Sequence, residues 1–73
     1  MIRTYCGRTF DGTQIDLIRA LIAEHPDLNR AQLSRLVCEA LPWWGADGRL
    51  KQMSCRVALL RMHDDGLIEL PPP

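Results

Sequence analysis

The first apolar pattern along the chain has the spacing of a helix. Four aliphatic residues recur every three or four positions, as on one face of an α-helix: Ile15, Ile18, Leu21 and Ile22. Asp11, followed three residues later by Gln14, has the form of a capping box, which satisfies free amides at a helix start. His25-Pro26 predicts the end, because proline disfavours helical geometry in the residue before it. The sequence therefore predicts a helix between these two signals.

The same signals predict a second helix. Asn29 and Gln32 have the form of another capping box, and Pro42 marks the end. The apolar stripe between them comprises Leu33, Leu36, Val37, Ala40 and Leu41. This stripe leaves four polar residues on the outer face: Arg30, Ser34, Arg35 and Glu39.

A third helix is predicted for residues 49 to 63, after a connection that contains the strong turn signal Asp47-Gly48. Gly66 would close it, because glycine tolerates the left-handed conformation. On a helical wheel its apolar residues form two arcs, which is typical of a central helix. One arc comprises Leu50, Met53, Val57 and Leu60, and the other Cys55, Ala58, Leu59 and Met62. The polar stripe between them comprises Arg49, Gln52, Arg56 and His63.

Two short segments have strand character, residues 4 to 10 and residues 67 to 70. Because a strand needs a partner, we predict that the two termini pair in a small two-stranded sheet beside the helices. This order predicts a mainly α, three-helix, winged-helix-like (helix-turn-helix) fold for residues 1–73 as a single domain. The prolines at 71–73 suit the start of a linker.

Composition agrees with one soluble globular domain. The 73 residues are 47% apolar and 25% charged, and the length is near the lower limit for a single core without cross-links. No apolar run approaches the roughly 20 residues that span a bilayer, and the N-terminus lacks the apolar stretch of a signal peptide. We therefore expect a cytoplasmic protein with no membrane partner.

The sequence contains no pattern for a metal, a cofactor or catalysis. Cys6, Cys38 and Cys55 are an odd number without a C-x-x-C pair, which predicts reduced thiols and neither a disulfide framework nor a zinc site. His25 and His63 are isolated, so we assign no metal. A Ser/His/Asp set, a glycine-rich phosphate loop and carboxylates paired for one cleft are all missing from the sequence. We expect a binding module without cofactors, and not an enzyme.

Charge is unevenly distributed although the formal net charge is zero. Residues 28–62 carry six basic and two acidic residues, so the middle of the chain is net positive and the flanks are net negative. A basic segment is the usual electrostatic footprint of a nucleic-acid binder, and a solvated surface of mixed sign is the alternative. On the DNA interpretation, Arg49, Gln52 and Arg56 line one side of the third helix, where Arg suits guanine and Gln suits adenine. Phosphate contacts are expected from Arg30, Ser34, Arg35, Lys51 and Arg61.

Residues 59–68 resemble the end of a winged-helix recognition helix that runs through Gly-Leu-Ile into the wing. The resemblance implies a buried face of Cys55, Ala58, Leu59 and Met62. It implies an outward face of Arg49, Gln52, Met53, Arg56, Val57 and Leu60.

A closer resemblance covers nearly the whole chain. Its motifs are Leu17-Ile18-Arg19-Ala20-Leu21-Ile22, Asn29-Arg30-Ala31-Gln32-Leu33-Ser34-Arg35, Trp44-Gly45, Asp47-Gly48-Arg49-Leu50-Lys51, Met53-Ser54-Cys55-Arg56 and Gly66-Leu67-Ile68-Glu69-Leu70-Pro71-Pro72-Pro73. These resemble the N-terminal region of the Druantia-type anti-phage defence proteins, a bacterial family long classed as a transposon-associated domain of unknown function. Such proteins continue well past the prolines, so the resemblance implies that this chain is the N-terminal part of a longer protein. It also implies a setting of phage defence or mobile elements, with contact to double-stranded DNA, but it identifies no catalytic residue in this chain. Where members often carry basic residues, this chain has Asp64 and Asp65.

Exposed apolar residues support a rival hypothesis of protein docking. Apolar residues at the surface meet protein more often than DNA, and the candidates are Met53, Val57, Leu60, Trp43 and Trp44. Core packing is the alternative for these residues, and we favour it for the tryptophan pair. The main prediction is a DNA-binding targeting module with its third helix in the major groove. The alternative is a docking or dimerisation module without nucleic-acid contact, whose partner is a downstream domain or a second copy.

Overall fold

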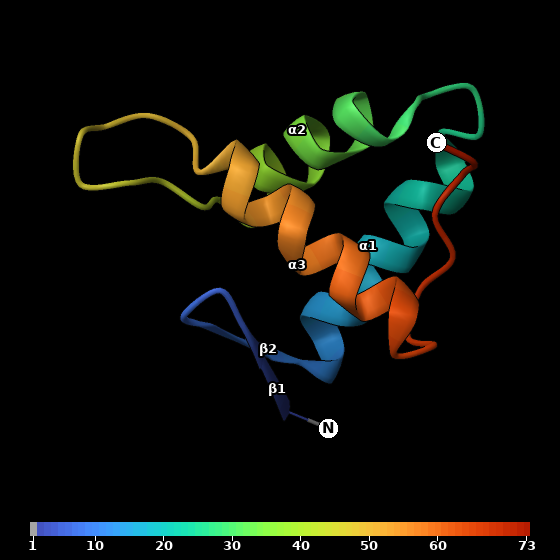
Figure 1. Cartoon of the computed structure of the whole chain (residues 1–73), viewed down its shortest axis with the longest axis horizontal. Helices are drawn as coiled ribbons and strands as arrows, with labels where there is room; N and C mark the ends of the chain where they lie inside the picture. Colours follow the sequence, from blue (N-terminus) through green and yellow to red (C-terminus); the bar gives the residue numbers. More distant parts are fainter. Residues whose placement is uncertain (1) are drawn as a thin grey trace.

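The structure, a computed structural model, describes residues 2–73. These residues form three helices and a short hairpin (Figure 1). The elements are β1 (Ile2–Tyr5), β2 (Arg8–Asp11), α1 (Gly12–Glu24), α2 (Arg30–Ala40) and α3 (Gln52–Asp64). This is the predicted mainly α, winged-helix-like domain with a two-stranded sheet. No helix within these residues combines the length and the apolar character needed to cross a bilayer.

Complete capping boxes begin the first two helices. The Asp11 carboxylate accepts the amide of Gln14 at 2.9 Å, and the Gln14 side chain accepts the amide of Asp11 at 3.2 Å. Asn29 and Gln32 make the same reciprocal pair at 2.8 and 3.0 Å. The predicted starts of both helices are therefore confirmed, and so are their ends immediately before Pro26 and Pro42.

The sheet is a hairpin within the N-terminal segment. β1 pairs antiparallel with β2, with Ile2 opposite Asp11 and Tyr5 opposite Arg8. Cys6 and Gly7 connect the strands with φ values of 51° and 76°, and two left-handed residues in succession are typical of a type I′ turn. The prediction that the two termini pair with each other is therefore wrong. Residues 4–10 do not form one strand, because the chain reverses at this turn.

The C-terminal extended segment, residues 67–70, pairs with neither strand of the sheet. Side chains hold its backbone instead: Arg19 Nε donates to the carbonyl of Leu67 at 2.5 Å, and the amide of Leu70 donates to His63 Nδ1 at 3.1 Å. After the left-handed Gly66 the chain turns back along α3 toward the far end of α1 (Figure 1). The strand predicted for residues 67–70 is therefore wrong, because side chains and not a second strand hold this backbone.

The core joins the hairpin to all three helices around the buried face of α3. Cys55, Ala58, Leu59 and Met62 are all buried, which confirms the predicted inner face of this helix. Aromatic rings link the hairpin to this core: Phe10 lies 6.1 Å from Tyr5 and 5.7 Å from Trp43 between ring centroids. The buried apolar side chains are Tyr5, Phe10, Ile15, Ile18, Leu33, Val37, Cys38, Trp43, Cys55, Ala58, Leu59, Met62, Leu67, Ile68 and Leu70.

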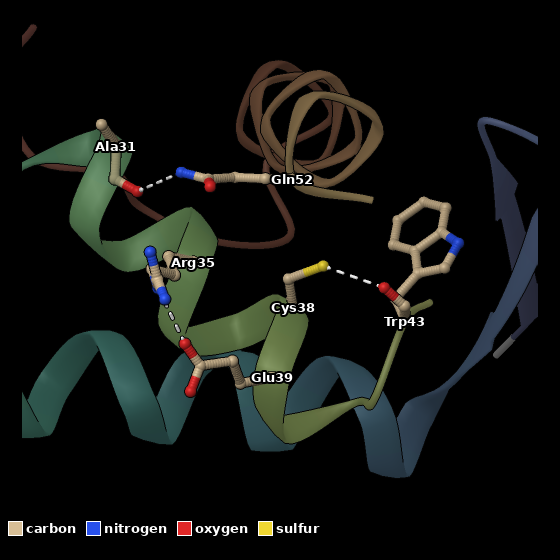
Figure 2. Close-up of polar contacts among 6 residues, drawn as sticks. All are labelled: Ala31, Arg35, Cys38, Glu39, Trp43 and Gln52. Atoms are coloured by element: carbon tan, nitrogen blue, oxygen red, sulfur yellow. Dashed lines mark hydrogen bonds and ion pairs between the residues drawn. The ribbon is translucent and has the colours of Figure 1, made fainter. Parts of the chain in front are cut away.

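All three cysteines are free, and two of them belong to the core. Cys38 on α2 donates its thiol hydrogen to the carbonyl of Trp43 at 3.2 Å (Figure 2). Burial raises the pKa of Cys38, and it raises the pKa of Cys55 on α3 to about 12, because a thiolate would lose its hydration there. Both thiols are therefore protonated at neutral pH and serve as small apolar core groups, whereas Cys6 is exposed in the hairpin turn.

Candidate nucleic-acid interface

The third helix begins three residues later than predicted, because the chain before it forms a bridged loop. The backbones of three residue pairs meet across this 43–51 loop: Trp43 with Lys51, Trp44 with Leu50 and Gly45 with Arg49. Gly48, at φ 79°, turns the chain at the tip, and the loop stands away from the helices (Figure 1). Arg49 is therefore outside α3, and the predicted helical row of Arg49, Gln52 and Arg56 is wrong.

Gln52 lies in the first turn of α3 and directs its amide toward α2. Its Nε2 donates to the carbonyl of Ala31 at 3.4 Å, and the residue is half-buried (Figure 2). This contact connects the N-terminal ends of α2 and α3. The Gln52 side chain therefore does not point along the outer face of the helix, where the predicted contact with adenine would require it.

The three α2 residues predicted to contact phosphates all have partners within the protein. Arg30 Nε donates to the carbonyl of Pro71 at 2.6 Å, and Arg35 Nε forms an ion pair with Glu39 at 3.0 Å (Figure 2). Ser34 is buried, and its hydroxyl donates to the carbonyl of Arg30 at 2.8 Å. The structure therefore does not favour the phosphate contact predicted for Ser34, because its hydroxyl is almost fully buried and already bonded within α2.

Exposed cations gather where α3 begins. Arg49, Lys51 and Arg56 are exposed, and none of the ion pairs found among residues 2–73 involves them. Lys51 occupies the N-cap position without a side-chain cap hydrogen bond, so the first amides of α3 are left for solvent or a ligand at the positive end of the helix dipole. We call these three cations and this helix start the basic end of α3. The uncapped start has a signal in the sequence, a lysine at the position where the other two helices have Asp11 and Asn29.

The opposite end of α3 contacts the hairpin and carries charges of both signs: Asp64 and Asp65 follow the exposed Arg61, for which a phosphate contact was predicted. The Tyr5 hydroxyl donates to Asp65 at 2.6 Å, and Arg3 lies 3.9 Å from the same carboxylate oxygen. Burial raises the pKa of Tyr5, and the hydrogen bond to this carboxylate raises it further. Because Asp64 and Asp65 are both exposed, this end of the helix attracts a polyanion less than the other end does.

An apolar ridge follows the outer face of α3 beyond the basic end. We define the exposed ridge as Met53, Val57 and Leu60, whose exposed fractions are 68%, 38% and 44%. Their predicted outward orientation is confirmed. Trp43 is buried among the aromatic rings of the core, so the interface role considered for it is wrong and the core alternative is right. Trp44 is 55% exposed on the 43–51 loop, so the core packing that we favoured for it is wrong.

Comparisons with known proteins assign no role to this site. No protein family, no curated protein and no solved structure matches the chain. The resemblance to the Druantia-type proteins thus stays a prediction. Within residues 2–73, no three His, Cys, Asp or Glu side chains are grouped so that they could hold a metal ion. The site is therefore defined by its exposed cations and by the apolar ridge beside them.

Proposed function

We propose that this chain is a DNA-binding module that holds duplex DNA through the basic end of α3. The observation that carries the proposal is that Arg49, Lys51 and Arg56, exposed and without ion pairs among residues 2–73, lie in the chain on either side of an uncapped helix start. Arg and Lys side chains and the amides of a helix N-terminus are the usual ligands of backbone phosphates. The net positive middle of the chain and its negative flanks favour the same orientation toward a polyanion.

Backbone contact explains this arrangement better than base reading does. Base edges in the major groove require hydrogen-bonding side chains along the helix, but the outer face of α3 is formed mainly by the apolar ridge. Arg56 is the one predicted base-reading residue that lies on α3 with an exposed side chain. In the proposed complex, α3 approaches the major groove by its N-terminal end, and the 43–51 loop lies against neighbouring phosphates. Such binding has low sequence selectivity.

The family resemblance, as a hypothesis, gives this module a biological setting. It would direct a larger phage-defence or mobile-element protein to DNA in the cytoplasm, and the chemistry would belong to another part of that protein. In this setting the module contributes affinity for DNA in general, and the attached part determines what is done to it.

We expect the affinity for a short DNA duplex to fall steeply as salt is added. Three phosphate contacts predict a slope of about −3 in a plot of log affinity against log salt, because each contact contributes about −0.9 through counterion release. Fluorescence anisotropy with a labelled duplex at several NaCl concentrations measures this slope. Arg56→Ala should reduce its magnitude by about one, whereas Arg61→Ala, which removes a cation toward the acidic end of the same helix, should leave it unchanged. A slope near zero, or an equal change in both variants, would contradict the proposal.

A further inference from the structure

A groove of about 280 Å³ lies between α2, α3 and the C-terminal extended segment. Its apolar lining comprises Met53, Val57, Leu59, Leu60 and Leu70, and its polar lining comprises Arg30, Ser34 and Arg56. The exposed ridge forms one side of this groove. The α2–α3 groove and the ridge are therefore one continuous surface.

The size of the groove suits one apolar side chain of a larger ligand. A cavity of about 150 Å³ holds a benzene molecule, whereas pockets for small organic ligands measure roughly 300 to 1,000 Å³. At about 280 Å³, the groove has room for a phenylalanine-sized or leucine-sized group and little beyond it. The structure thus favours an inserted side chain over a complete small molecule.

The positive charge of the groove favours an acidic ligand. Two guanidinium groups, those of Arg30 and Arg56, line it, and no acidic residue does. Neither arginine belongs to an ion pair found within residues 2–73. The bond from Arg30 Nε to Pro71 fixes that guanidinium beside the groove. A carboxylate is the natural complement, because a guanidinium can bind it through two parallel hydrogen bonds.

The exposed ridge favours a helical ligand. Met53, Val57 and Leu60 follow each other at spacings of four and three along α3, so they form a continuous apolar row. Recognition of one helix by another uses such rows, and a methionine adapts to different neighbours. Duplex DNA would leave this row largely uncovered, because thymine methyl groups are the main apolar surface in its major groove.

We infer that the α2–α3 groove docks an acidic amphipathic helix of a protein partner. One large apolar side chain of the partner enters the groove, its apolar stripe covers the ridge, and its carboxylates bind Arg30 and Arg56. The inference rests on the apolar surface, the shape and the charge of the groove, and it does not require the DNA-binding proposal to be true. Arg56 is common to both surfaces, and the acidic helix and DNA therefore compete for the protein.

A synthetic peptide pair tests the chemistry of the partner. The probe is a fluorescein-labelled amphipathic helix with one central Phe in a Leu stripe and Glu on both sides of the stripe. We expect saturable binding by anisotropy to the whole chain. Affinity should fall about tenfold or more when the Glu residues are replaced by Gln, and likewise when the central Phe is replaced by Ala. No saturable binding, or equal affinity for the probe and its Gln form, would overturn the inference.

Matched protein variants test the place of docking. Leu60→Asp, at a position 44% exposed on the ridge, should weaken the probe about tenfold or more, and Leu17→Asp, at a position 39% exposed on α1, should not. Met53→Asp, at a still more exposed position of the ridge, replaces Leu60→Asp if circular dichroism shows that the latter unfolds. Equal losses in the Leu17 and ridge variants would overturn the inference. So would a dimer, found by light scattering, that Leu60→Asp dissociates, because the face would then belong to a second copy. A ridge variant that weakens DNA binding and leaves the probe unaffected would assign the face to DNA, with the same consequence.

Discussion

Replacing Phe10 with Ala should lower the free energy of unfolding by about 3 to 5 kcal/mol, the range typical of a buried aromatic ring. The side chain is fully buried, and its ring contacts those of Tyr5 and Trp43. Its removal leaves a cavity between the hairpin and the helices, which these two rings cannot fill without losing their own contacts. A domain of this length has a stability of about 4 to 11 kcal/mol, so the variant should be close to unfolding.

Urea denaturation, followed by circular dichroism, measures the loss in the Phe10 variant. Leu17→Ala is the matched control, since this residue is also apolar but 39% exposed, and we expect less than about 1 kcal/mol for it. Similar losses at both positions would mean that the aromatic contacts do not hold the hairpin to the core.

Reversing two charges at the basic end of α3 should have the largest effect on DNA binding. In Lys51→Glu/Arg56→Glu we expect the affinity to fall at least about 25-fold at about 0.15 M salt, because each lost phosphate contact costs about fivefold there. Repulsion between the new carboxylates and the phosphates adds to this loss. Anisotropy with the same labelled duplex measures the affinity, and circular dichroism shows whether the exposed substitutions leave the fold intact.

The double variant Arg35→Glu/Arg61→Glu is the matched control for charge. It changes the net charge by the same amount, but Arg35 is paired with Glu39 on α2 and Arg61 lies near the acidic end of α3. Neither arginine belongs to the basic end of α3, so we expect a loss smaller than that of one phosphate contact, below about fivefold. Equal losses in the two double variants would show that overall charge attracts DNA, without a defined site.

Local signals predicted most of the fold. The capping boxes at Asp11 and Asn29 were predictable because both partners lie within one helical turn. The buried face of α3 followed from its periodicity, since Cys55, Ala58, Leu59 and Met62 recur at helical spacing. Both kinds of signal concern residues that are close in sequence, where local preferences are decisive.

The errors in the fold arose where backbone pairing across a turn decides the structure. The pairing of β1 with β2 depends on the turn at Gly7, and a glycine inside an apparent strand is a signal of such an interruption. The late start of α3 depends on the bridge between Trp44 and Leu50, for which the turn signal Asp47-Gly48 was a partial indication.

The candidate site was predictable only in part, because contacts between residues distant in the sequence position its side chains. Lys51 and Arg56 are exposed as the DNA hypothesis requires. The contact of Arg30 with Pro71 joins residues 41 positions apart, and no local pattern indicates it. The burial of Ser34 and Trp43 likewise depends on how helices and loop come together.

A nuclear magnetic resonance titration with a short DNA duplex tests the central claim most directly. If the basic end of α3 holds DNA, the amide signals of residues 49–56 should shift as duplex is added, and those of α1 should stay in place. Shifts centred on α1 or on the β1–β2 hairpin, or no shifts at a saturating duplex concentration, would contradict the account.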